Sequence, residues 1–309
     1  MLKPRNWEEY ELIDSGGFEK LERFGSVVTV RPEPQALWRK ALPEEEWERT
    51  ANAVFRRGAS EGAPSGKRAQ ADERGTWDLR PGVPGQWKID YAYKDMSLRM
   101  RLGFTAFKHV GLFPEQAENW DFIYDSIGRI KSGADGRPAV LNLFAYTGGA
   151  TLAAALAGAA VTHVDSVKQV VGWARENATG SGLDQIRWIV DDVAKFVARE
   201  VRRGNRYRGI ILDPPAYGRG PDGEKWVLEQ HLPALLDHCA RLLEPSGSFL
   251  ILNLYSMGLS SLLARSTVKD IFRADLFAAS DEKYGELYFS DRGGRQLPLG
   301  VFYRAFFGR

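Results

Sequence analysis

The sequence predicts an α/β protein with a Rossmann-like, seven-stranded C-terminal sheet and a smaller N-terminal α+β domain that contains a β-hairpin. After residue 137, short apolar runs alternate with helical patterns, which is typical of a parallel sheet covered by helices. Residues 87–102 instead alternate apolar and polar positions, which indicates two paired strands. We expect residues 1–106 to form the N-terminal domain and residues 107–309 the second.

The N-terminal elements follow from local patterns. In the hairpin, Trp87 and Ile89 belong to an apolar face, and Arg99 and Arg101 should lie on the opposite face. The other elements expected here are a strand at 25–30, a helix at 41–57, a glycine-rich surface loop at 60–75, and a helix that follows residues 107–122 and ends near Lys131.

The second domain repeats strand and helix. Residues 133–138 (GADGRP) are expected to be a linker before its first strand. The expected strands are 140–144, 161–165, 186–190, 209–212, 249–254 and a closing pair at 284–289 and 300–307. The expected helices are 150–160, 168–178, 193–203, 224–243 and 259–272.

Composition excludes several classes of protein. The 309 residues are 44% hydrophobic and 27% charged, which suggests about two globular domains. We see no apolar run of the ~18 residues that a membrane span needs, and no signal-peptide core in the first residues. A single cysteine permits neither an intramolecular disulfide nor a cysteine zinc site, so we expect a reducing, cytoplasmic compartment. With a net charge of +2, any basic surface must arise from local clustering.

The loop after the first strand of the second domain is the first candidate site. Residues 145–149 read Ala-Tyr-Thr-Gly-Gly, at the sheet edge where open α/β proteins bind ligands. Gly148 and Gly149 permit close approach of a ligand and begin a helix whose free N–H groups can bind a carboxylate. The loop lacks the GxGxxG pattern of dinucleotide-binding proteins.

Acidic residues end three further strands. Asp165 could bond both hydroxyls of an adenosine ribose, Asp192 could reach an adenine amino group, and Asp213 ends the fourth strand. Each aspartate alone could be a helix cap. Because the carboxyl ends of parallel strands share one edge, the three together favour a nucleoside-binding site.

These segments resemble a known family. NLFAYTGG (142–149), VDS (164–166), DDV (191–193) and DPPAY (213–217) are similar to the motif series of class I S-adenosylmethionine-dependent methyltransferases. More narrowly, they resemble the bacterial 23S ribosomal RNA large-subunit methyltransferases that form 5-methylcytosine or 7-methylguanine. GLFPEQ (111–116) and RQLPLG (295–300) extend the similarity, whereas the first hundred residues match less well and show no clear PUA-type RNA-binding module. Asn142 stands where related enzymes often have an acid.

The resemblance implies an enzyme that binds S-adenosyl-L-methionine, with an N-terminal substrate-recognition domain and ribosomal RNA as its partner. The catalytic residues implied are Asp213, near the sulfonium and the target atom, and Tyr217, which would stack on a flipped base. The cofactor-binding residues implied are Phe113, Gln116, Phe144, Ala145, Tyr146, Thr147, Gly148, Gly149, Asp165, Ser166, Asp192, Val193, Asp213 and Pro214.

The position of the one thiol argues against 5-methylcytosine. Methylation of a pyrimidine at carbon 5 needs a nucleophile at carbon 6, normally a thiolate. Cys239 lies among leucines of an expected helix, and the segment after the fifth strand, where the 5-methylcytosine relatives carry their thiol, has no cysteine. We therefore expect direct transfer to a base nitrogen, either a ring nitrogen or an exocyclic amine.

Other interpretations stay open. The enzyme could methylate a protein or a small molecule, or the chain could be a non-catalytic RNA-binding relative; a nicotinamide dehydrogenase is disfavoured by the missing GxGxxG. The arginines of residues 199–208 could contact phosphates or simply form a solvated helix end. The four histidines show no metal-ligand spacing, and His109 is a candidate substrate contact. Oligomeric state does not follow from the sequence.

Overall fold

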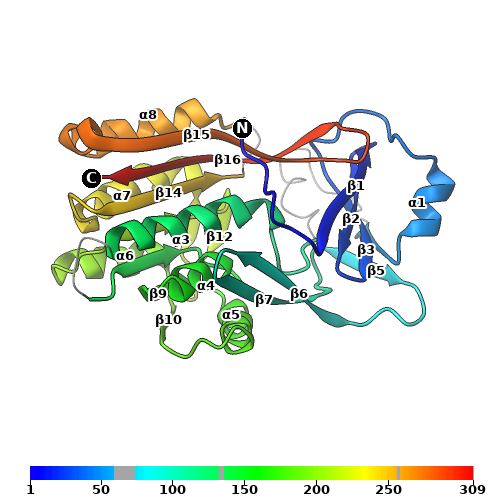
Figure 1. Ribbon diagram of the computed structural model, residues 1–309, viewed down its shortest axis with the longest axis horizontal. Helices are drawn as coiled ribbons and strands as arrows, with labels where there is room; N and C mark the ends of the chain where they lie inside the picture. Colours follow the sequence, from blue (N-terminus) through cyan, green and yellow to red (C-terminus); the bar gives the residue numbers. More distant parts are fainter. Residues whose placement is uncertain (59–73, 132–135, 256–257, 309) are drawn as a thin grey trace.

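The computed structural model describes residues 1–58, 74–131, 136–255 and 258–308. Figure 1 shows a large sheet with its helices at one end and a smaller N-terminal sheet at the other. The long strands β15 and β16 run from the first toward the second. No helix among these residues is long and apolar enough to cross a membrane.

The large sheet has the predicted seven strands. Its order is β10-β9-β8-β11-β14-β16-β15; the first five strands are parallel, and β16 is antiparallel to both of its neighbours, β14 and β15. The strands are β8 (Ala139–Leu143), β9 (Ala160–Asp165), β10 (Ile186–Val190), β11 (Gly209–Leu212), β14 (Ser248–Leu254), β15 (Ser280–Ser290) and β16 (Gln296–Phe307). Since β8 is central and β9 and β11 flank it, their carboxyl ends meet at a switch point of the sheet.

Helices cover both faces of this sheet. Alternate β8 residues point to opposite sides: Val140 packs in the cluster of α3 and α4, and Leu141 packs in that of α6, α7 and α8. The helices are α3 (Ala117–Lys131), α4 (Gly149–Leu156), α5 (Lys168–Gly180), α6 (Val193–Arg202), α7 (Leu228–Leu242) and α8 (Ser261–Ile271), with short 3₁₀ turns η1 (Pro114–Gln116) and η2 (Ala274–Ala279).

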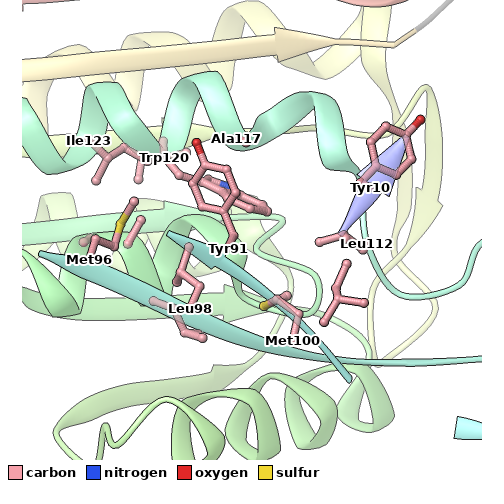
Figure 2. Close-up of a cluster of buried hydrophobic side chains, with 14 of the residues drawn as sticks. Tyr10, Tyr91, Met96, Leu98, Met100, Leu112, Ala117, Trp120 and Ile123 are labelled. Atoms are coloured by element: carbon pink, nitrogen blue, oxygen red, sulfur yellow. The ribbon is translucent and has the colours of Figure 1, made fainter. Parts of the chain in front are cut away.

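The predicted hairpin is confirmed. Strands β6 (Gln86–Tyr93) and β7 (Met96–Gly103) pair antiparallel, and Arg99 lies on the exposed face. Figure 2 shows the apolar face of the hairpin packed beneath α3, where the rings of Tyr91 and Trp120 are 5.4 Å apart. This packing makes the hairpin part of the apolar cluster that covers the large sheet.

The N-terminal sheet is richer in strands than the sequence indicated. It contains β1 (Tyr10–Gly16), β2 (Glu19–Phe24), β3 (Val27–Pro32), β4 (Ala53–Arg57) and β5 (Gly75–Leu79), in that order. The turn between β15 and β16 holds this sheet in place, because Asp291 accepts a hydrogen bond from Ser15 at 2.8 Å and Arg295 pairs with Asp14.

Two of the helices in the structure are shorter than the sequence predicted. The helix expected at 41–57 is only α1 (Glu44–Thr50): Asn52 bonds the backbone of Val28, and the chain continues as β4 beside β3. The helix expected at 224–243 starts at Leu228, because a small hairpin, β12 (Tyr217–Arg219) and β13 (Lys225–Val227), precedes it. Most of the loop expected at 60–75, and residues 133–135 of the expected linker, lie outside the described residues.

Candidate functional site

Two adjoining cavities lie at the carboxyl ends of β8, β9 and β11. The outer cavity measures about 630 Å³ and the inner cavity about 50 Å³. They share the lining residues Leu112, Phe113, Phe144, Tyr146 and Asp213. The outer cavity alone is of a size that holds a small ligand.

The loop after β8 forms the floor between the cavities in a strained conformation. Phe144 and Tyr146 have φ angles of 54° and 48°, in the left-handed region that non-glycine residues rarely adopt. The Tyr146 N–H donates to Asp165 at 2.9 Å, and Ala145 bonds the Val164 carbonyl at 3.1 Å. Such strain persists where the surroundings hold it and is common at binding sites.

Glycine is needed at both positions 148 and 149 of this loop, but for different structural reasons. Gly148 has a φ of 93° and stands at the start of α4, which suits the absence of a side chain. A Cβ atom on Gly149 would lie 2.5 Å from the Trp120 ring, so glycine is needed there for packing. The prediction that Gly149 leaves room for a ligand therefore accounts for only part of its role; both glycines and Thr147 line the inner cavity.

Asp165 lies at the end of β9 and lines the outer cavity with Ser166. Its carboxylate accepts hydrogen bonds from the N–H groups of Tyr146 and Val167, at 2.9 and 3.0 Å. Burial raises its pKa, although these backbone hydrogen bonds act in the opposite direction. The residue thus joins the β8 loop to the β9 loop and faces the space beside them.

Asp213 ends β11 and faces both cavities. Its Oδ1 atom is buried and has no hydrogen-bond partner among the described residues. Burial, and secondarily the charge of Glu115, raise its pKa to about 7. An unpaired buried carboxylate oxygen is costly, so this atom is a ready acceptor for a ligand.

A network of amides and a tyrosine closes the inner side of the site. Gln116 donates to the Tyr255 hydroxyl at 2.6 Å, and Asn119 and Asn253 both donate to the Gln116 side-chain oxygen. The Tyr255 hydroxyl donates to Glu115 at 3.0 Å, and burial raises the Glu115 pKa to about 7. The sequence predicted Gln116 as a site residue but not the other four; Glu115 lies beside it in the resembling segment, Asn253 lies in the expected strand at 249–254, and Tyr255 follows that strand.

Aromatic residues line the entrance. The ring of Phe113 lies 5.4 Å from Tyr146 and 5.6 Å from Tyr255. Tyr217 begins β12 and, with Pro214, lines the outer cavity. Their position beside Asp213 agrees with the predicted grouping.

Two predicted site residues are not brought to the cavities. Asp192 is the N-cap of α6, where its carboxylate accepts a hydrogen bond from the Lys195 N–H at 2.9 Å. Val193 is buried in the apolar cluster beneath the sheet. Neither residue lines either cavity, so the geometry gives Asp192 the capping role that its position in sequence also allowed.

The remaining candidates have ordinary structural surroundings, with one exception. Cys239 is buried on α7, which raises its pKa, and it lines neither cavity. His163 bonds Thr151 at 2.9 Å, whereas His109 lines the outer cavity, and burial lowers its pKa well below the usual value. No cluster of metal-ligating side chains occurs within the described part of the chain.

The arginines of residues 199–208 mostly bond the protein itself. Arg203 pairs with Glu200, while Arg206 and Arg208 donate to backbone carbonyls at the end of α7 and the turn after it. Arg199 pairs with Asp191. This favours the structural interpretation of the run over a phosphate-binding one.

Comparisons with known proteins agree with this geometry. A family model described as S-adenosylmethionine-dependent methyltransferase matches residues 67–274. The crystal structure of the S-adenosylmethionine-dependent methyltransferase from Agrobacterium tumefaciens is 38% identical and superposes with a TM-score of 0.84, over 100% of this chain and 93% of that one. A putative S-adenosylmethionine-dependent methyltransferase from Streptococcus mutans shares the fold, at 14% identity and a TM-score of 0.66, over 97% of this chain and 76% of that one.

The curated relatives are longer proteins. The ribosomal RNA large subunit methyltransferase K/L of Shewanella frigidimarina is 28% identical over 170 residues, which are 54% of this chain and 22% of that protein. The chain therefore spans about a fifth of the length of the curated relatives that it matches.

Proposed function

This chain belongs to the S-adenosylmethionine-dependent methyltransferase family and is a methyltransferase that uses S-adenosyl-L-methionine; on that premise, we propose that it methylates ribosomal RNA by direct transfer to a base nitrogen. We also propose that residues 1–106 serve substrate recognition and that the enzyme acts in the cytoplasm.

The residues at the two cavities fit the cofactor. Asp165 offers a carboxylate at the end of β9 for the ribose hydroxyls, and the strained loop at Phe144 and Tyr146 provides backbone groups beside it. The unpartnered Oδ1 of Asp213 offers a negative charge toward a cationic ligand. When bound, the cofactor supplies a methyl group activated by its positively charged sulfur.

The protein's own groups support transfer to nitrogen. Asp213 is the buried acceptor in the cavity and can orient a base through one of its N–H groups, while Glu115 and Tyr255 lie next to it as a hydrogen-bonded pair. The one cysteine is buried in α7 and lines neither cavity, so this chain offers no thiolate for attack on carbon 6 of a pyrimidine. Orientation and proximity are then the main contributions of the protein.

The observation that best supports an RNA substrate is the set of side chains on the wall of the outer cavity. Its lining includes Tyr217, Asp213 and the cationic residues Lys108 and Arg219. A cavity that contains an aromatic ring and a buried acceptor suits an unstacked base, and cationic side chains suit the RNA backbone. The printed name of the matching relatives, which are ribosomal RNA methyltransferases, supports the same substrate class.

The test is transfer of a labelled methyl group from S-adenosyl-L-methionine to ribosomal RNA purified from a strain that lacks the gene, followed by nucleoside mass spectrometry. We expect label in a nucleoside methylated on a base nitrogen. Label in 5-methylcytosine would contradict the nitrogen target. Label in protein or small molecules, with none in RNA, would contradict the RNA substrate.

A further inference from the structure

We propose that Lys20, on β2 of the N-terminal sheet, and Glu33, directly after β3, are specificity residues that bind the hydrogen-bonding edge of the target base. The inference rests on the proposed RNA substrate. Both residues precede the segment matched by the family model, which begins at residue 67.

The geometry begins with two paired strands. Lys20 on β2 lies directly opposite Arg31 on β3, and Glu22 and Glu33 follow two residues further along their segments on the same side. Arg31 contacts Glu22 at 2.7 Å, and the Lys20 ammonium lies 3.4 Å from both Glu22 and Glu33. All four side chains are nearly buried, and Lys20, Arg31 and Glu33 line the outer cavity.

A contribution to the stability of the fold does not explain why these four charged side chains lie together. Four charges on a buried sheet face carry a desolvation cost that ion pairing often fails to recover, and apolar residues there would be equally stable or more so. The opposite face of the same strands is apolar, with Leu21 and Val30 packed near Trp47. The charged face is the one that meets the cavity.

The charge balance of these four residues does not favour a phosphate as their ligand. The two cations and two carboxylates cancel, whereas the cationic side chains proposed to face the RNA backbone, Lys108 and Arg219, belong to other segments of the cavity wall. Arg31 has its nitrogens committed, two to Glu22 and the third to the Lys108 carbonyl at 3.2 Å. A neutral ligand with its own donors and acceptors fits such a wall better than an anion does.

Lys20 and Glu33 supply a donor and an acceptor side by side. Their separation of 3.4 Å is longer than a good charged hydrogen bond, and Glu33 otherwise accepts one hydrogen bond, from the Gln35 N–H at 3.3 Å, so both groups keep capacity to bond a ligand. The edge of a nucleobase presents acceptors and N–H donors next to each other, and proteins that bind a flipped base read it there. Because the same cavity contains Asp213 and Tyr217, one base could meet all four groups.

The experiment compares Lys20→Met and Glu33→Gln with wild type, using labelled methyl transfer to the ribosomal RNA described above. We expect kcat/KM for RNA to fall about 10- to 100-fold, mainly through KM, while the dissociation constant of S-adenosyl-L-methionine stays within about two-fold. Lys88→Met and Glu45→Gln are matched controls, since these side chains are exposed and line neither cavity, and they should retain wild-type values.

A role in folding alone predicts a different result. If the variants melt at lower temperature but the folded enzyme keeps its KM for RNA, the inference is wrong. Should a single variant fail to fold, the double variant Lys20→Met/Glu33→Gln keeps the net charge of these four positions at zero and must show the same rise in KM for RNA. If the wild-type enzyme transfers no methyl group to RNA, both the proposed function and this inference are wrong. If the wild-type enzyme is active and the variants have the same KM for RNA, only this inference is wrong.

Discussion

Asp213→Asn should stabilise the protein without cofactor while nearly abolishing methyl transfer. Burial raises the pKa of Asp213 in the folded state to about 7, whereas an unfolded aspartate has a pKa of about 3.9. The folded state therefore binds more protons, so the contribution of this group to stability is full below about pH 4 and is lost as the pH rises toward 7.

The expected change in the free energy of unfolding follows from the difference between these two pKa values. Raising the pKa of one carboxyl from about 3.9 to about 7 changes that free energy by at most about 4 kcal/mol. Asp213 is only partly buried as a residue and lines both cavities, so we expect about 1–3 kcal/mol at pH 8 and little at pH 4.5. Asparagine keeps the shape and removes the charge, so the variant should gain this free energy of unfolding.

Urea denaturation at the two pH values, without cofactor, measures the gain. Labelled methyl transfer at pH 8 should fall about 10²-fold or more, as it does when a positioned catalytic group is lost. For the wild type, kcat/KM should rise with pH through an apparent pKa near 7 that belongs jointly to Asp213 and Glu115. Asp237→Asn, at an exposed position of α7, is the control and should change neither quantity. A variant that is less stable at pH 8 and still transfers methyl groups normally would refute the reasoning.

Further predictions concern the cofactor site and the core. Asp165→Ala removes the proposed ribose acceptor and two backbone hydrogen bonds, so calorimetry should show cofactor affinity weakened about 10- to 100-fold. Asp192→Ala should cost about 1 kcal/mol of stability through the lost α6 cap; an affinity loss as large as that of Asp165→Ala would instead support an adenine contact. Cys239→Ala should leave methyl transfer within about two-fold and lower the free energy of unfolding by about 1 kcal/mol, and loss of transfer in a folded variant would argue for a thiol mechanism. Gly149→Ala places a Cβ atom 2.5 Å from Trp120 and should destabilise by about 1–3 kcal/mol; an unchanged melting temperature would show that the Trp120 ring moves aside.

Much of the large sheet could be predicted from local patterns. The strand at residues 186–190 has the expected limits, and the helix that ends at Lys131 has the expected end but starts earlier, at Ala117, because each has its own apolar periodicity. Asp165 and Asp213 were also found, since an acid directly after an apolar strand is recognisable without knowledge of the partner strands.

The N-terminal sheet and the small hairpin before α7 were harder to predict. Strands β1 and β2 mix charged and apolar residues, because one face of β2 carries Lys20 and Glu22 in a buried ion-pair network. A rule that counts apolar positions would therefore assign these residues to a solvent-exposed segment. In β13, Trp226 is held by a hydrogen bond to the Pro215 carbonyl at 2.7 Å, a contact that a helical pattern starting at Glu224 does not reveal.

The sequence by itself determined the order in which the motifs follow one another along the chain, the acids at the strand ends and the presence of a single thiol. These features depend only on the sequence and on neighbours along the chain. Only the tertiary structure decided that Asp213 lacks a partner, that Asp192 is turned to a helix cap, and that Lys20 faces the same cavity as Asp213. Hydrogen-bond partners and burial are set by segments distant in sequence, and it is burial and pairing that give each carboxylate its chemistry.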